Sequence, residues 1–283
     1  MALVTGWDES PVTAVERPVQ ARAPRSPLGA VALPAEHGGW ALTLEPGLLG
    51  LLIAPGAAGL CVAVGAMVAF LARTPLKIAL VDRRRGRDLK RTRLARRVAA
   101  VELTVLVLLA AGAFVLAESG FWVPGIAALP LLGVEAWFDV RSRGRRLVPE
   151  LAGAIGVCSV AAMVLLADGQ TPQLAIGAWL VLAARVSTSI PHVRAQIARL
   201  HRRTSPARAA RLGDVAAVLL AAAAVAADRH LVAGAVAVLA IITFQRFTRT
   251  RPVPRPVVLG LRQMAMGFAV VVVTALGVLV SAS

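Results

Sequence analysis

The stretch Arg73–Arg97, RTPLKIALVDRRRGRDLKRTRLARR, carries eleven basic residues and only two acidic ones, Asp82 and Asp88. Long apolar segments flank it on both sides. In membrane proteins, connections rich in Lys and Arg stay on the cytoplasmic side. The stretch therefore predicts that the chain crosses a membrane and that this connection faces the cytoplasm.

Composition supports a membrane protein. The 283 residues are 58% hydrophobic with a mean hydropathy of +0.74, whereas a soluble domain has roughly 45–50% apolar residues. A net charge of +16 in a soluble protein would suggest nucleic acid, but here the basic residues lie between apolar segments, where topology explains them. We therefore expect no nucleic-acid partner. Cys61 and Cys158 lie within apolar segments and lack the spacing of a disulfide framework or a zinc site.

Apolar segments and their punctuation predict an all-α membrane protein with about nine transmembrane helices. We expect a disordered cytoplasmic tail at 1–33 and a polytopic transmembrane domain at 34–283, with basic cytoplasmic loops at 73–97, 139–146, 192–211 and 245–262. The expected spans are about 34–54, 57–72, 95–117, 121–138, 147–167, 174–190, 212–227, 231–244 and a ninth that ends near residue 280. All but two of the 31 basic residues lie in the tail or these loops, the exceptions being Arg185 and Arg229. An odd number of spans then places the N-terminus in the cytoplasm and the C-terminus outside.

Polar residues within spans are the candidates for function, because a charge at mid-membrane costs roughly 2.5–3.5 kcal/mol on insertion scales. In the first span, helical spacing places Glu36, His37 and Trp40 on one face. Glu45 follows, and the ring of Pro46 is expected to interrupt the helix there. The alternative is that Glu36 complements the helix dipole while His37 and Trp40 lie in the headgroup layer.

Three further groups lie at the inner ends of the spans. Arg73 and Lys77 are one turn apart at the end of the second span, where they can meet an anionic head group. Glu135 and Asp139 end the fourth span, and mutual ion pairing is the alternative for them. Arg141 and Glu150 lie next to this group in the sequence. The third group is a stripe of the sixth span formed by Arg185, Ser189 and His192, with Arg194 beyond it. A buried Arg185 needs a partner, which is either a carboxylate such as Glu45 or Glu135 or a ligand phosphate.

The motif Glu36-His37-Gly38-Gly39-Trp40 resembles the EHGAW-type opening of the YwiC-like family of bacterial integral membrane proteins. The resemblance covers roughly residues 34–281 and continues through Arg73-Thr74-Pro75, Glu150-Leu151-Ala152-Gly153, Ala184-Arg185 and Val193-Arg194-Ala195-Gln196. It implies a multi-pass protein of a bacterial inner membrane. It implies no biochemical activity.

Nine helices with polar inner connections also resemble, more distantly, the UbiA-type membrane prenyltransferases. That resemblance implies Mg²⁺ held by aspartate-rich motifs against a prenyl pyrophosphate, with the prenyl chain in an apolar cavity. Asp82 and Asp88 lie where the first such motif would be, but PHVRAQIARLHRR, after the sixth span, holds no carboxylate. Since two Mg²⁺ ions need several oxygen ligands, at most one ion is expected, at Asp82 and Asp88.

The resulting hypothesis is a UbiA-like enzyme, or a ligand-binding relative, for an isoprenoid or other amphipathic lipid with an anionic head, with anionic phospholipids of the inner leaflet as further partners. The head would be bound in one inward-opening chamber by cations, namely Arg73, Lys77, Arg141, Arg185 and Arg194. Trp40, Glu45, Asp139, Ser189 and His192 would complete the binding site. Acid–base work would fall to His37 with Glu36, or to Glu150. Two alternatives are a carrier or channel component for a proton or small anion, and a non-catalytic assembly protein.

Overall fold

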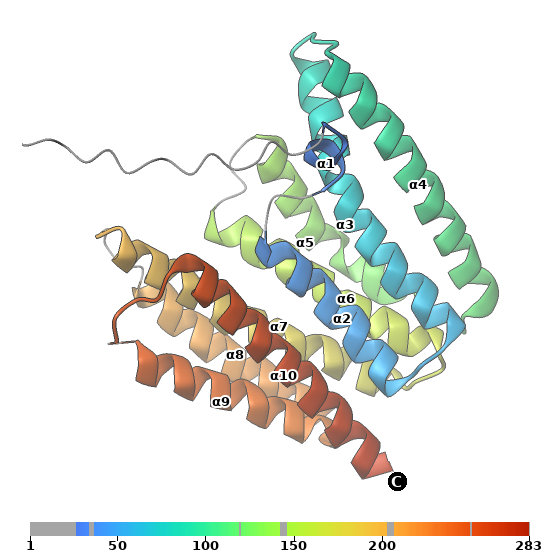
Figure 1. Cartoon of the computed structure of the whole chain (residues 1–283). Coiled ribbons are helices and arrows are strands. Elements are labelled where there is room, and N and C mark those ends of the chain that lie inside the picture. The colour runs from blue at the N-terminus through green and yellow to red at the C-terminus, as the bar shows by residue number, and fades with distance from the viewer. Residues whose placement is uncertain are drawn as a thin grey trace, which may run out of the picture.

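A computed structural model describes residues 27–33, 37–118, 120–141, 146–202, 207–249 and 251–282. Every regular element in these ranges is a helix (Figure 1). The helices are α1 (Pro27–Ala32), α2 (His37–Ile53), α3 (Ala57–Arg84), α4 (Lys90–Leu116), α5 (Val123–Val140), α6 (Leu147–Ala167), α7 (Pro172–Leu200), α8 (Ala207–Ala227), the short 3₁₀ helix η1 (Arg229–Leu231), α9 (Val232–Thr248) and α10 (Pro256–Ala282).

The helices α2 to α10 correspond one to one with the nine apolar segments expected from the sequence. Helix α1 lies at the end of the expected tail 1–33, of which residues 1–26 lie outside the described ranges. Seven helices are long and apolar enough to cross a membrane, namely α3, α4, α6, α7, α8, α9 with η1, and α10. The protein is therefore a multi-pass helical membrane protein, in which the shorter apolar helix α2 and the 18-residue α5 complete the bundle.

Prolines do not end the helices where the sequence predicted. Helix α2 continues through Pro46, and α7 continues through Pro191 to Leu200, so the expected interruption and the expected loop from residue 192 are both wrong there. Proline leaves the carbonyl four residues earlier without a helical partner, which membrane helices tolerate where a neighbour covers it. In α7 that carbonyl belongs to Ser187, and Gly213 of α8 lies so close to it that a Cβ would overlap the oxygen.

The basic segments expected as loops are largely helical. Arg73–Arg84 is the last part of α3, and α4 begins at Lys90. Because successive helices alternate in direction, the connections α3–α4, α5–α6, α7–α8 and α9–α10 lie toward one end of the bundle, here called the basic end (Figure 1). The C-terminus lies at the opposite end.

Helix α7 is the most deeply buried of the candidate spans. It packs against α6 and α8 and also contacts α9, α10 and α2, while α2 lies between α6 and α10. Many core positions are alanine or glycine, which lets membrane helices approach closely. Helix α4 packs mainly on α3 and turns a row of apolar side chains outward, as expected for a face in contact with lipid.

Candidate functional site

A buried ion pair joins three helices at the centre of the bundle. Arg185 of α7 donates through Nη2 to Oε1 of Glu45 on α2 at 2.9 Å and to the backbone oxygen of Gln263 on α10, also at 2.9 Å. Only 4% of the Arg185 side chain and 2% of the Glu45 side chain are exposed. Of the partners that the sequence left open for Arg185, the carboxylate of Glu45 is the one observed.

The ion pair depends on a close approach of α10. At Gly267 a Cβ would overlap both Glu45 Oε1 and Arg185 Nη2, so only glycine fits beside the pair. One turn farther from the basic end, the bundle is apolar and closed, because fully buried Leu49, Val181 and Val270 belong to the same core cluster. The pair is thus the last polar layer before an apolar seal.

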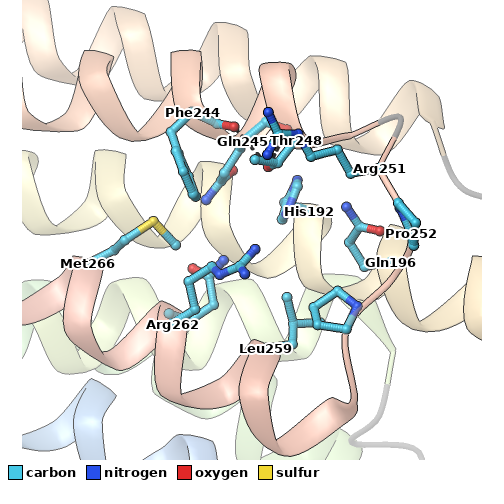
Figure 2. A pocket seen from close by; sticks show the side chains of 12 residues that line it. His192, Gln196, Phe244, Gln245, Thr248, Arg251, Pro252, Leu259, Arg262 and Met266 are labelled. Carbon is cyan, nitrogen blue, oxygen red and sulfur yellow. Dashed lines mark hydrogen bonds between the residues drawn. The ribbon is translucent and has the colours of Figure 1, made fainter.

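On the basic-end side of this pair lies a cavity of about 260 Å³ between α7, α9, α10 and the α9–α10 connection, here called the α7–α9–α10 cavity (Figure 2). Its lining mixes cationic, amide and apolar side chains. These residues are His192, Gln196, Phe244, Gln245, Thr248, Arg251, Pro252, Pro254, Leu259, Arg262, Gln263 and Met266.

Several buried polar atoms around this cavity have no hydrogen-bond partner within the described part of the chain. They are Nε2 of Gln245 and Oε1 of Gln263, which line the cavity, and Oγ of Ser189 and Nε of Arg185 on the same stripe of α7. A buried polar atom without a partner costs roughly 1–3 kcal/mol. Such atoms therefore favour a site that a polar group of a ligand completes.

The charge of the lining is positive. Arg251 and Arg262 line the cavity, and none of its described lining residues is a carboxylate. The acid beside it, Asp214 of α8, already accepts from Thr188 Oγ1 at 2.7 Å and from Arg246 Nε at 3.1 Å. The unbalanced charge next to the amides is thus cationic.

Arg199 fixes the connection that closes the cavity. Its guanidinium donates to the backbone oxygens of Arg249 and Arg251 and, at 3.2 Å, to Gln196 Oε1. The Arg262 guanidinium lies 5.8 Å from the ring centre of Phe244, within the range of a cation–π contact. The backbone of Arg251 and the guanidinium of Arg262 are therefore each in contact with a neighbouring side chain.

A second charged group lies between α3 and α5. Arg73 bonds Glu135 Oε1 at 2.7 Å and Asp139 Oδ2 at 2.5 Å, and Lys77 bonds Asp139 Oδ1 at 3.2 Å. The ion pairing of these carboxylates, which the sequence left open as an alternative to ligand binding, is therefore present.

The other predicted site residues are spread over several contacts. Glu150 of α6 pairs with Arg194 of α7 at 2.7 Å, and both side chains are partly exposed. The guanidinium carbon of Arg141 lies 3.7 Å from the ring centre of Trp137. Trp40 packs edge-on against Phe70 with ring centres 5.5 Å apart. Glu36 lies outside the described residues, as does the side chain of His37.

The predicted residues therefore form separate groups. His192 lines the α7–α9–α10 cavity, and Arg185 adjoins it through Gln263. Arg73 and Lys77 lie in the α3–α5 group instead. The sequence did not indicate which of these helices face one another.

Asp82 and Asp88 bind side chains of the α3–α4 hairpin. Asp82 accepts from Thr92 Oγ1 at 2.6 Å and from Arg91 at 3.1 Å, while Asp88 pairs with Arg93 and, at 3.6 Å, with Arg96. Across the described ranges, His, Cys, Asp and Glu side chains do not gather in threes as a metal site would require. Within those ranges the expected single Mg²⁺ site thus gains no third ligand.

Comparison with known families finds a match for the first half of the chain. Residues 33–165 match the family model described as YwiC-like protein. The chain carries a YwiC-like segment. No curated protein and no solved structure matches the chain, and the resemblance to UbiA-type prenyltransferases is not shown.

The YwiC-like segment contains α2 to α5 and nearly all of α6. It therefore supplies Glu45 and the whole α3–α5 group. The partner of Glu45, Arg185, and every described residue that lines the α7–α9–α10 cavity lie beyond the match. The buried ion pair joins the YwiC-like segment to the remainder of the chain.

The residues that distinguish this cavity were not predicted from the sequence. Gln245 and Gln263 are uncharged, and Arg251 and Arg262 lay in a segment expected to be a solvated loop. Two acidic residues within apolar segments were also missed: Asp214, which is buried, and the half-buried Glu102, whose Oε2 has no partner among the described residues. A lone acid inside an apolar segment of α4 or α8 was the available signal.

Proposed function

We propose that this YwiC-like membrane protein binds an amphipathic molecule with an anionic head group in the α7–α9–α10 cavity. The observation that carries the proposal is that two arginines, unopposed by any acid of the described lining, lie beside Gln245, whose buried Nε2 has no hydrogen-bond partner among the described residues. Guanidinium groups bind phosphate and carboxylate through charge-assisted hydrogen bonds. The head group would bind Arg251 and Arg262 and accept a hydrogen bond from the unpaired Nε2 of Gln245.

The apolar part of the lining suits the other end of such a molecule. Phe244, Leu259 and Met266 contribute a surface on which an apolar tail can pack. The exposed ring of Phe244 places the edge of the cavity at the bundle surface. An isoprenoid or acyl tail therefore has a route toward the surrounding lipid.

The side chains of this cavity support binding rather than group transfer. Of the predicted acid–base residues, Glu150 is engaged by Arg194 instead of lying in the cavity. A metal-dependent prenyl transfer would in turn require carboxylate ligands, and the described lining holds none. The chemistry of the lining thus favours recognition of an anionic head group.

A carrier for protons or small anions is the second candidate, favoured by the buried charges of Glu45 and Arg185. A carrier needs an opening to the far side, and the core beyond this pair is apolar and fully buried at Leu49, Val181 and Val270. Ligand binding from the basic end needs no such opening. We therefore place binding first.

The test is a comparison of lipids that differ in the head group. Purified protein in detergent would be titrated with a polyprenyl phosphate, a diacylglycerol phosphate and a zwitterionic phosphatidylcholine, with native mass spectrometry and thermal unfolding as measurements. We expect the two phosphates to bind and to raise the melting temperature. Replacing Arg251 and Arg262 by Gln should weaken binding by roughly tenfold for each lost charge-assisted contact.

Arg255→Gln is the matched control, because Arg255 is exposed on the same connection but does not line the cavity. Equal binding of phosphatidylcholine, or equal loss in the control, would contradict the proposal. Uptake of an anion into proteoliposomes that survives the double substitution would favour the carrier instead.

We also propose that all nine helices α2 to α10 cross the membrane, with the basic end in the cytoplasm of a bacterial cell and the C-terminus outside. The support is the charge distribution, since Lys and Arg concentrate in the connections at one end. The α7–α9–α10 cavity would then be reached from the cytoplasmic leaflet.

A further inference from the structure

A cleft of about 250 Å³ lies between α3 and α5, away from the α7–α9–α10 cavity. Both helices pack against α6, but their backbones approach each other at few points. One stripe of α3 and one stripe of α5 line the cleft, and the ion pairs of Arg73 with Glu135 and Asp139 bridge it. The two helices therefore leave an open groove on the outer surface of the bundle.

Apolar side chains form most of the walls of this α3–α5 cleft, and Lys77 and Arg84 lie about one turn on either side of Leu80 along α3. Leu76, Leu80 and Leu132 form much of the walls. Lys77 is half exposed, and Arg84, at the end of α3, has no carboxylate partner among the described residues. This combination of apolar walls and two available cations is complementary to an acyl chain attached to a phosphate.

The charges of the lining point to a single negative charge on the occupant. Three cations, Arg73, Lys77 and Arg84, face two carboxylates, Glu135 and Asp139. Arg73 forms ion pairs with both carboxylates, and Lys77 forms one ion pair, with Asp139. The excess positive charge thus lies toward Lys77 and Arg84.

We propose that the α3–α5 cleft binds one anionic glycerophospholipid of the surrounding membrane. Its phosphodiester lies between Lys77 and Arg84, and one acyl chain packs along Leu76 and Leu80. A monoanionic phosphodiester balances the excess charge of the lining, and the lateral opening admits a lipid directly from the bilayer. This site is independent of the function proposed for the α7–α9–α10 cavity.

The experiment measures lipid retention by the full chain. Protein reconstituted in nanodiscs of equal parts phosphatidylglycerol and phosphatidylcholine would be released into detergent, and the retained lipid counted by native mass spectrometry. We expect one phosphatidylglycerol to be retained in preference to phosphatidylcholine. The variant Lys77→Ala/Arg84→Ala should retain less, by about fivefold for each charge removed.

The variant Arg83→Ala/Arg85→Ala is the charge control, since both residues are exposed in the same segment but do not line the cleft. Equal loss in the two variants would show diffuse attraction to the basic end and would overturn the proposal.

A second pair of variants tests the cleft without changing charge. Ala136 lines the cleft and is exposed, so Ala136→Phe should fill it without disturbing the core and should reduce retention severalfold. Val134→Phe, on the exposed face of α5 outside the lining, is the control. Unchanged retention in Ala136→Phe, at an unchanged melting temperature, would also overturn the proposal.

Discussion

Arg185 and Glu45 form the most completely buried ion pair of the described residues, and each depends on the other. Removing one partner of a buried pair leaves an uncompensated charge, which typically costs about 3–5 kcal/mol. We expect Arg185→Ala to lower the stability of the folded protein by that order. Unfolding by SDS titration in mixed micelles, followed by tryptophan fluorescence, measures the change.

The control is Arg229→Ala, because Arg229 is exposed at the opposite end and should tolerate the change. The double variant Glu45→Leu/Arg185→Leu should be less destabilised than Arg185→Ala alone, since it leaves no unpaired charge. A larger loss of stability in the double variant than in Arg185→Ala would contradict this dependence.

Gly267 allows a test of the same pair through the backbone of α10. We expect Gly267→Ala to be destabilising by about 1–3 kcal/mol, because the added methyl group would overlap both charged side chains. At Gly260 on the same helix, a Cβ would meet no neighbouring atom within 4 Å among the described residues. Gly260→Ala should therefore be neutral or stabilising by up to about 1 kcal/mol through helix propensity. Similar melting temperatures for the two variants would contradict a close approach at Gly267.

Individual residues could be predicted from the sequence when their charge stood out against an apolar background. Arg185 and Glu45 did so, and their pairing was among the expected outcomes. Gln245 and Gln263 did not, because an uncharged amide in a helix does not by itself indicate a binding site. Their role depends on the cavity formed where α7, α9 and α10 meet. Arg251 and Arg262 were indistinguishable from solvated arginines of the same segment.

At the scale of helices, apolar length was the reliable predictor and proline was not. Pro191 does not end α7, and the carbonyl of Ser187, which it leaves without a helical partner, is covered by Gly213 of the next helix. That cover comes from another element, and a single segment of sequence does not reveal it. The basic residues after Pro191 are therefore helical and extend the stripe of α7 that carries His192.

The α3–α4 hairpin offers a test at this scale. Asp82 is buried and bonded to Thr92 across the hairpin, whereas Asp88 is half exposed and pairs with surface arginines. Asp82→Ala should loosen the hairpin and speed tryptic cleavage between residues 83 and 97. Asp88→Ala should change it little, because exposed ion pairs contribute about 0–1 kcal/mol. Equal effects of the two substitutions, together with protection of the wild type by added Mg²⁺, would instead support a shared metal site.

For the whole molecule, the charge pattern predicted which ends of the helices lie together, and the structure groups those connections at one end. It could not predict which helix faces contact. The hypothesis of a single binding chamber required Arg73 and Arg185 to lie close together. In the structure Arg73 bonds to α5, whereas Arg185 bonds to α2 and α10. Contacts between helices depend on small residues such as Gly267, and the distribution of charge along the sequence does not indicate where such contacts form.

The number of spans can be decided at the tip of the α3–α4 hairpin. If α2 and α5 did not cross and the N-terminus were still in the cytoplasm, seven spans would also place the C-terminus outside, so a reporter there cannot distinguish these two arrangements. They differ at Gly86, which nine spans place in the cytoplasm and seven spans place outside. The arginines on both sides of Gly86 favour the cytoplasm, because translocating a cationic connection is costly. We expect green fluorescent protein fused after Gly86 to fluoresce and alkaline phosphatase fused there to be inactive, with the reverse result for fusions after Glu118.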